Sequence, residues 1–431
     1  MNKKILFGCI AISTMGLPPA GAETVIYRFA KIIDGTGDVL DARDIAVENK
    51  RIKVVGNNLD ASISGTVITL DGLTALPGLI DAHTHITYGL SEYPEGDAWA
   101  ALGTIERAER FESSKINALK TLQTGVTSVR DLNADQQLDF DLKAAINSRQ
   151  IPGPRIYTSG PGIHPFNDPL PEGMEAASTD FLKRAAEKRI AMGADWIKIF
   201  GTTGSASDLT SRAYYSAEAI TAAADAAKAA GKRITVHTYG PEAVDAAIAG
   251  GVTSIDHPVG MSDQQIKAMA SAGIIYVPTI DHNRYYAQHH SEYGYDEHIQ
   301  ANLHVFVGRN IETARKAHAA GVTLAMGSDA VLSGFGENTC ELKAFVAAGL
   351  STAEAIQTAT VGGAKLLGEE NNLGRLQPGF EADFIAVSGD PLADISVITD
   401  GVLMVMKAGE VLVDHRADPA QINKPNCGTL Y

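Results

Sequence analysis

The sequence predicts an α/β protein, in which a (β/α)8 TIM-type barrel is joined to a small β-sandwich formed by the N- and C-terminal segments. Through roughly 290 central residues, short apolar segments alternate with alanine-rich amphipathic segments about eight times. Both ends of the chain contain only short β-type runs separated by Gly, Asp and Asn turns. A doubly wound open sheet is the alternative, but no glycine-rich dinucleotide fingerprint follows the first strand of the alternating region.

The composition is that of a globular protein and excludes few functions. Of the 431 residues, 45% are hydrophobic and 20% are charged, and an excess of acidic residues gives a formal net charge of -15. A negative protein repels nucleic acid and anionic membrane surfaces, so we expect neither as a partner. After the N-terminal segment, no run of 18 apolar residues could span a membrane.

Residues 1–22 have the pattern of a secretory signal peptide. Two lysines precede a short apolar run, and an A-x-A cleavage site ends at Ala22. Cleavage after Ala22 leaves 409 residues with a net charge of -17, and it predicts a periplasmic or secreted protein. A lipoprotein signal at Cys9 is the alternative, although only four apolar residues precede that cysteine.

Two cysteines, Cys340 and Cys427, remain in the mature chain. An oxidising compartment permits a disulfide between them, but two separate thiols fit the sequence equally well. Two thiols are too few for a cysteine-based metal site.

The two ends of the chain predict one β-sandwich that flanks a central barrel. Residues 23–75 contain the runs VIYRFAKII, DIAVEN, RIKVVG and TVITL, and residues 369–431 contain FIAVSG and VLMVMKAGEVLVD. We therefore assign 23–75 and 369–431 to the sandwich, and 76–368 to the barrel.

Eight apolar segments are the expected barrel strands: 76–85, 126–132, 155–160, 196–200, 233–238, 254–257, 274–279 and 323–329. Helices are expected between most of them, for example over 180–194 and 216–231. The active-site residues of such barrels stand at the C-terminal ends of the strands. This rule directs the search for a site.

Four of the 12 histidines end expected strands. His83 and His85 are two residues apart at the end of the first strand, so both imidazoles face one side and can share a metal ion. His237 ends the fifth strand and His257 the sixth, and Asp329 ends the eighth. Taken singly, each of these residues also fits a packing or surface role.

Lys198 lies in the apolar strand Trp196-Ile197-Lys198-Ile199-Phe200. Burial lowers the pKa of a lysine, and a neutral amine can add carbon dioxide to give a carbamate that bridges two divalent metal ions. The alternative is a lysine that forms a salt bridge with a barrel carboxylate. Because the six polar residues fall at strands 1, 4, 5, 6 and 8 of a barrel predicted on other grounds, coincidence is a poor explanation.

In this order the six residues resemble the binuclear metal site of the amidohydrolase superfamily: His83, His85, Lys198, His237, His257 and Asp329. The surrounding segments LPGLIDAHTH, TGVTSVRD, VHTYG, GVTSIDH and MGSDA agree. Among its branches the chain most resembles the imidazolonepropionase-like group, which includes the Xaa-Pro dipeptidases, related carboxypeptidases and ochratoxin-hydrolysing amidohydrolases.

The resemblance implies two divalent metal ions, and the histidine-rich shell favours Zn²⁺. It places His83, His85 and Asp329 at the more buried metal, His237 and His257 at the other, and carboxylated Lys198 with a hydroxide between the two. Asp329 would take the proton of the nucleophile and pass it to the departing amine. Deaminases of the superfamily typically use one metal and lack a lysine like Lys198, so the resemblance favours hydrolysis of an amide.

Two further residues match this branch. Tyr239 resembles the tyrosine that donates to the substrate carbonyl as an oxyanion forms, and His164 resembles the histidine that receives the free carboxylate of the substrate. A loop tyrosine and a surface histidine are the alternatives. The implied substrate is an N-acyl amino acid or the C-terminal residue of a short peptide. A cyclic amide or lactone hydrolase, and a binding protein without stoichiometric metal, are the alternative functions.

The segment 281–304 is rich in tyrosine and histidine. It fits a lid over an apolar substrate pocket, an exposed helix or a subunit contact equally well. We expect the protein to form a homo-oligomer.

Overall fold

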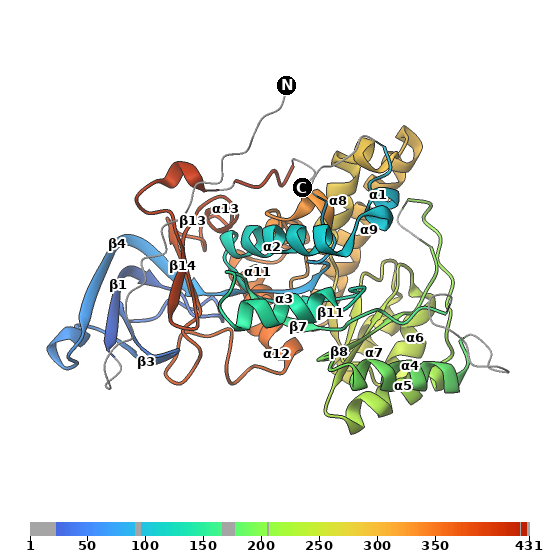
Figure 1. Cartoon of the computed structure of the whole chain (residues 1–431), viewed down its shortest axis with the longest axis horizontal. Coiled ribbons are helices and arrows are strands. Elements are labelled where there is room, and N and C mark those ends of the chain that lie inside the picture. Colours follow the sequence, from blue (N-terminus) through green and yellow to red (C-terminus); the bar gives the residue numbers. More distant parts are fainter. Residues whose placement is uncertain (1–22, 91–95, 166–176, 205–206, 423, 429–431) are drawn as a thin grey trace.

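The computed structural model of the chain describes residues 23–90, 96–165, 177–204, 207–422 and 424–428. The signal peptide expected over 1–22 lies outside these residues. The strands of a terminal sheet lie at one end of the molecule, and most of the helices lie at the other (Figure 1).

The first and last strands of the chain form one seven-stranded sheet in the order β14-β13-β12-β4-β1-β2-β3. Its strands are β1 (Thr24–Ile32), β2 (Asp44–Glu48), β3 (Arg51–Gly56), β4 (Thr66–Pro77), β12 (Phe384–Ser388), β13 (Val402–Lys407) and β14 (Glu410–Asp414). Strands β1 and β4 are parallel, and the other pairs are antiparallel. Tyr27 and Phe29 pack edge-on against Phe384, so aromatic residues from both ends of the chain hold this sheet together.

The alternating region forms two parallel sheets, β5-β6-β7 and β8-β9-β10-β11. Their strands are β5 (Leu79–Thr84), β6 (Val126–Asp131), β7 (Arg155–Thr158), β8 (Trp196–Phe200), β9 (Arg233–His237), β10 (Ser254–Asp256) and β11 (Ile275–Val277). Seven of the eight expected strands are therefore present. The first begins at Leu79, because Leu76 and Pro77 still pair within the terminal sheet.

Parallel bridges connect these sheets to one another. Ile163 pairs with Ile199, Tyr276 with Leu324, and Thr84 with Ala330. The seven strands and the segment 323–330 thus form a continuous hydrogen-bonded circuit, which brings the C-terminal ends of the strands together.

The expected strand over 323–329 is wrong in detail, because this segment makes single bridges rather than a ladder. Ser328 donates through its backbone N–H and its hydroxyl to the Asp81 carboxylate, at 2.9 and 2.6 Å. Asp329 has a φ of 52°, which a strand cannot accommodate. Side-chain hydrogen bonds and a left-handed residue therefore replace the regular strand.

Helices fill the connections between the parallel strands: α1 (Ala98–Thr104), α2 (Arg107–Gln123), α3 (Leu138–Asn147), α4 (Thr179–Ala191), α5 (Ala217–Ala229), α6 (Val244–Ala249), α7 (Asp263–Ala272), α8 (Ile280–Gln288) and α9 (Glu297–Ala319). Four more follow the circuit: α10 (Cys340–Ala347), α11 (Thr352–Gln357), α12 (Gly363–Leu367) and α13 (Ser396–Thr399). Side-chain N-caps explain several starts, since Ser178 begins α4 and Ser216 begins α5. Within the described part of the chain, no helix has the length and apolar character to cross a membrane.

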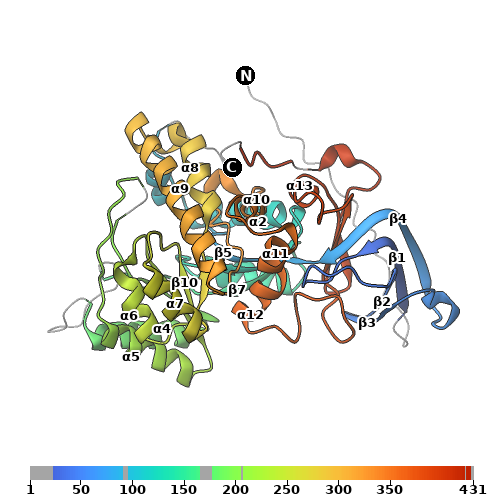
Figure 2. The same ribbon diagram turned by 180° about the vertical axis from the view of Figure 1, so that it is seen from behind.

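The apolar sides of these helices pack against the parallel strands. Ile197 and Ile199 of β8 share one buried cluster with Val236 of β9 and Ala223 of α5. The view from behind shows α4, α5, α6 and α7 grouped at the lower left, and α8 and α9 above them (Figure 2). Strand ends that carry polar groups are thereby held in a rigid apolar frame.

Candidate metal centre

Elements of the circuit bring together all six residues expected to bind metal. His83 lies in β5 with His85 just beyond it, and Lys198 lies in β8. His237 is the last residue of β9, and His257 directly follows β10. Asp329 follows the irregular eighth segment, where its N–H donates to the carbonyl of His83 at 2.7 Å. The rule that strand ends carry the site therefore selected residues that the structure brings close together.

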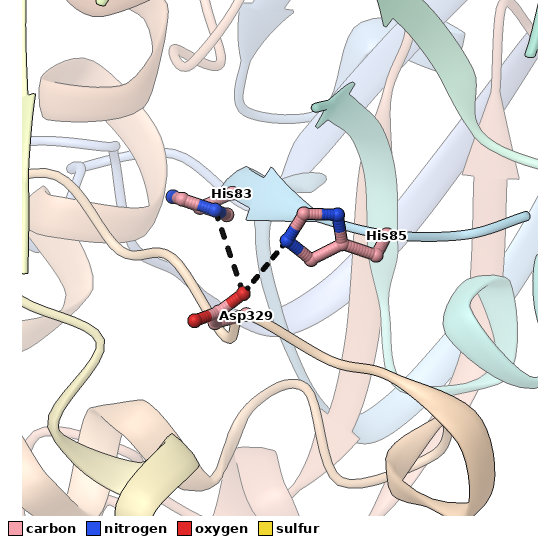
Figure 3. Close-up of side chains that lie close together, drawn as sticks. All are labelled: His83, His85 and Asp329. Carbon is pink, nitrogen blue, oxygen red and sulfur yellow. Dashed lines mark ion pairs between the residues drawn. The ribbon is translucent and has the colours of Figure 1, made fainter. Parts of the chain in front are cut away.

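His83, His85 and Asp329 form the best-defined part of the site (Figure 3). The Oδ1 atom of Asp329 lies 3.4 Å from Nε2 of His83 and 3.0 Å from Nε2 of His85. One ligand atom of each residue lies within 4.8 Å of the others. Two imidazole nitrogens and a carboxylate oxygen in this arrangement fit a divalent metal such as Zn²⁺.

In two of these histidines, one ring nitrogen lies beside a polar group outside the cluster. Nδ1 of His83 lies 3.3 Å from Oδ2 of Asp256, and Nδ1 of His257 lies 2.7 Å from the hydroxyl of Thr279. Such outer contacts fix the ring orientation of metal-binding histidines and direct the opposite nitrogen inward. Their presence here supports a metal-binding role for both rings.

The rings of His237 and His257 complete the cluster. Their centroids are 4.6 Å apart, and His257 is also 4.6 Å from His83. His257 adopts a left-handed φ of 76°, which costs energy for a residue other than glycine and is typical of functional sites. The cluster therefore extends beyond the first three ligands toward the position expected for a second metal.

Lys198 is buried, and its ammonium lies 3.0 Å from Oδ2 of Asp256. Arg130 binds the other oxygen of that carboxylate at 3.0 Å. The salt-bridged alternative for Lys198 is therefore the state that the structure displays. Burial nevertheless lowers the pKa of Lys198, and the charge of Asp256 only partly offsets this effect.

The electrostatics of the site favour the protonation states that bind metal. Burial lowers the pKa of His83 to about 3, and the positive charge of Lys198 adds to the effect. Burial likewise holds the pKa of His237 and of His257 well below the usual value. Desolvation alone would raise the pKa of Asp329, but its electrostatic interactions with His282, His83 and His257 and a hydrogen bond with His85 hold the pKa well below its usual range. Neutral imidazoles around an ionised carboxylate are the forms that coordinate a cation.

The structure places Tyr239 at the edge of this cluster. Its ring is 4.7 Å from that of His237 and 5.7 Å from that of His257. Burial, with the negative charge of Asp329 as a smaller cause, raises the pKa of Tyr239. The phenol therefore keeps its proton at neutral pH and can donate a hydrogen bond.

His164 lies farther from the histidine cluster than Tyr239 does, with the ring of Phe200 between it and His237. Its centroid is 5.8 Å from that of Phe200, which is 5.1 Å from that of His237. The His164 side chain is half-buried, and burial lowers its pKa. The surface-histidine alternative is therefore too simple, because the ring packs between Phe200 and Tyr214.

Sequence reasoning missed four polar residues of the interior. Asp256 binds Lys198, Arg130 and His83, and Asp81 accepts from Ser328 and Asn338. His282 lies 3.4 Å from Asp329. A signal for Asp256, Asp81 and Arg130 was available: each is a charged residue inside an expected apolar strand, as Lys198 is. His282 gave no such signal.

The tyrosine-rich segment 281–304 packs beside the site. Tyr285, Tyr286 and Tyr293 are buried in a cluster that also contains Val331 and Leu332 and that contacts Tyr239. The exposed-helix alternative is therefore wrong for α8, because its side chains face a packed interior.

The cysteines Cys340 and Cys427 form a disulfide. This bond resolves the alternative that the sequence left open. It joins the start of α10 to the C-terminal residues of the described chain.

An α/β circuit whose strand ends gather histidines and an aspartate is an arrangement suited to a metal-dependent hydrolase. The model of the amidohydrolase family matches residues 74–412, and the chain belongs to that family. Ochratoxinase of Aspergillus niger is 28% identical over 424 residues, covering 90% of this chain and 86% of the relative. Membership of this family and the similarity to ochratoxinase identify the protein as an enzyme that hydrolyses carbon–nitrogen bonds.

Solved structures agree with this assignment. A Xaa-Pro dipeptidase with methionine bound in its active site has a TM-score of 0.81 and 30% identity, and the match covers 91% of this chain and all of the other. The crystal structure of ochratoxinase from Aspergillus niger has a TM-score of 0.77 and 25% identity, over 94% of this chain and 99% of the other. Both belong to the branch that the sequence motifs indicated.

Proposed function

We propose that this protein is a binuclear metal-dependent hydrolase that cleaves the amide bond of N-acyl amino acids, or of the C-terminal residue of short peptides. The convergence of His83, His85 and Asp329 on one point is the observation that carries the proposal. The ochratoxinase and Xaa-Pro dipeptidase likenesses support this substrate class, because both names denote enzymes that act on such amides.

Two bound divalent metal ions, for which we propose Zn²⁺, would lower the pKa of a water molecule and polarise the carbonyl of the substrate. His83, His85 and Asp329 would hold one ion and His237 and His257 the other, with Lys198 between them as a carbamate formed with carbon dioxide. Burial lowers the pKa of Lys198, which is the direction that favours the neutral amine needed for addition of carbon dioxide. Carboxylation would require Lys198 to leave Asp256.

Asp329 has the position of a proton carrier. Its Oδ1 atom faces His83 and His85, and its Oδ2 atom lies on the side of His257, at 3.7 Å. An ionised carboxylate at this point can accept a proton from the attacking water and deliver it to the departing amine. Tyr239, which stays protonated, would donate to the carbonyl oxygen as negative charge develops.

His164 would receive the free carboxylate of the substrate, and Tyr239 would contact the carbonyl between that carboxylate and the metal site. A cavity of about 170 Å³ opens beside Tyr239 and is lined in part by Leu209, Val259 and Phe306. Polar residues, among them Glu242 and Arg309, also line it, and it offers room for an acyl group or a side chain of the substrate. A larger cavity of about 580 Å³ is lined by residues at the opposite end of the eighth segment, among them Thr323 and Leu324, so we assign it no part in catalysis.

The finer architecture and the location of the enzyme are also proposals. We propose that the hydrogen-bonded circuit is a (β/α)8 barrel over residues 76–368, and that the terminal sheet is the sandwich formed by 23–75 and 369–431. We further propose export to the periplasm or the medium, which the Cys340–Cys427 disulfide supports. Light scattering would test the expected homo-oligomer.

Metal analysis combined with a screen of N-acyl amino acids tests the proposed function. We expect two metal ions per chain and hydrolysis of acyl amino acids with a free carboxylate. The control is Lys198→Ala, which should lose activity in bicarbonate-free buffer. Addition of a short-chain carboxylic acid, which can take the place of the carbamate, should restore part of the activity. Full activity of Lys198→Ala without any added acid would refute the carbamate bridge. Activity on lactones but not on acyl amino acids would favour the cyclic-substrate alternative.

A further inference from the structure

His282 contacts the oxygen of the Asp329 carboxylate that His83 and His85 do not approach. Its Nε2 atom lies 3.4 Å from Oδ2 of Asp329, whereas His83 and His85 approach Oδ1. Its side chain is 5% exposed, and it has a further hydrogen bond with the backbone of Asp329. The two oxygens of Asp329 therefore have different histidine partners.

Asp329 needs an external support of this kind. Its φ of 52° lies in the left-handed region, and the segment that carries it has no regular strand pairing. A carboxylate on such a segment can rotate about its own side-chain bonds unless each oxygen is held. His282 supplies a donor for the oxygen that His83 and His85 leave open.

The His282 ring is itself fixed by its surroundings. It packs edge-on against Tyr286, one helical turn later in α8, with ring centroids 4.3 Å apart. The first N–H groups of α8 donate to the buried carboxylate of Glu341, from Ile280 at 2.9 Å and from Asp281 at 2.7 Å. This cap holds the start of the helix, where His282 lies.

A second anchor holds α8 from the C-terminal end of the chain. The fully buried guanidinium of Arg284 binds Asp281 and Glu337, and it donates to the carbonyl of Asn426 at 2.8 Å. Cys427, the next residue, is bonded to Cys340 at the start of α10. The described C-terminal residues accordingly contact α8. An anchored helix can hold a ring to the accuracy that an active site requires.

We propose that His282 is a positioning residue, which donates from Nε2 to Oδ2 of Asp329 and thereby keeps Oδ1 directed at His83 and His85. The inference rests on the proposed function for its link to catalysis, but the effect on the Asp329 carboxylate is a property of the site itself. His282 is distinct from the six expected ligands, and it acts through Asp329.

Two substitutions separate positioning from packing. His282→Phe keeps an aromatic ring against Tyr286 but removes the donor, and His282→Gln keeps an N–H near the same place. We expect kcat of His282→Phe on an acyl amino acid to fall roughly ten- to a hundredfold, with KM within about twofold. We expect His282→Gln to recover most of this loss. His304→Phe and His304→Gln, on an exposed histidine of α9, are the matched controls and should behave like the parent enzyme.

Zinc affinity, measured by competition with a chelator, gives a readout that does not depend on turnover. We expect Zn²⁺ to bind His282→Phe roughly tenfold more weakly than the parent enzyme, because outer contacts of this kind tune metal affinity. Unchanged kcat and zinc affinity in His282→Phe would overturn the inference, and so would a His282→Gln variant as impaired as His282→Phe. If the parent protein bound zinc but hydrolysed no acyl amino acid, the proposed function would be refuted. The role of His282 could still be tested, because it depends on the zinc affinity of His282→Phe relative to that of the parent.

Discussion

Lys198 of β8 and Asp256 of β10, two strands separated by β9, form a buried ion pair. Nζ and Oδ2 are 3.0 Å apart, and neither side chain is more than 1% exposed. Asp256 also receives Arg130 and the hydroxyl of Thr235. Two cations therefore share one buried carboxylate. Burial of charge is tolerated only where such partners are present.

Removal of that carboxylate should destabilise the protein strongly. Asp256→Asn leaves the charges of Lys198 and Arg130 without their shared anion, so we expect the free energy of unfolding to fall by about 3–5 kcal/mol. Urea denaturation followed by circular dichroism measures the change. Asp225→Asn, at an exposed position of α5, is the control and should change stability by less than about 0.5 kcal/mol. A loss equally small in Asp256→Asn would show that Asp256 does not hold the two cations.

Tyr239→Phe should lower kcat without loss of metal. The phenol is the donor that we assign to the developing oxyanion, and removal of one such donor costs roughly a hundredfold in kcat. Steady-state kinetics on an acyl amino acid, with metal content measured in parallel, tests this expectation. Tyr27→Phe in the terminal sheet, where the ring contact with Phe384 is retained, should leave kcat unchanged. Equal kcat in Tyr239→Phe and the parent would remove Tyr239 from the catalytic groups.

His164→Ala should reduce the preference for substrates with a free carboxylate. Loss of a hydrogen bond to a charged group lowers kcat/KM roughly ten- to a hundredfold. The parent enzyme and the variant are compared on one acyl amino acid and on its carboxamide. We expect the variant to treat the two alike, because the group that distinguishes them is gone. A variant that retained the full preference would show that another residue binds the carboxylate.

The proximity of the candidate metal ligands could be predicted because their positions follow from chain connectivity. Parallel strands that alternate with helices bring their C-terminal ends together, so His83, His237 and His257 had to meet if the strands were correctly placed. The terminal sheet was predictable for a related reason, since short β-type runs at both ends need partners. The spacing of apolar residues along the chain indicates where strands and helices lie, and this spacing can be read from short stretches of sequence.

The contacts between side chains could not be predicted in the same way. Asp256 and Arg130 are far apart in the sequence, and their pairing depends on how individual strands pack across the interior. His282 lies on a helix whose placement is set by Glu341, Arg284 and the C-terminal residues. The irregular segment before Asp329 likewise results from hydrogen bonds to Asp81, which an apolar strand pattern cannot reveal.

Loss of the disulfide should lower stability. The bond joins residues that are 87 positions apart, and closure of a loop of that length contributes about 4 kcal/mol in the chain-entropy model. We expect the Cys340→Ser, Cys427→Ser double variant to lose about 2–5 kcal/mol of unfolding free energy, as measured by urea denaturation without reductant. Dithiothreitol should bring the parent protein to the same stability and leave the double variant unaffected. A parent protein that is insensitive to reductant would contradict this expectation.

The buried carboxyl of Asp139, in α3, should make stability depend on pH. One of its oxygens accepts the N–H of Gly160 at 2.8 Å, and burial raises its pKa from 3.8 to about 6. The folded state then binds a proton more tightly than the unfolded state, so the contribution of Asp139 to stability is present below pH 4 and is lost as the pH rises to about 6.

Asp139→Asn cannot ionise but keeps an acceptor for Gly160. The unfolding free energy of Asp139→Asn minus that of the parent should therefore be larger at pH 7 than at pH 4.5, by an amount on the order of 2 kcal/mol. Urea denaturation at the two pH values measures the difference. Asp141→Asn, on an exposed residue of the same helix that pairs with Arg107, should change stability by less than about 1 kcal/mol. A stability difference between Asp139→Asn and the parent that was the same at both pH values would mean that Asp139 is already ionised at pH 4.5 in the folded protein.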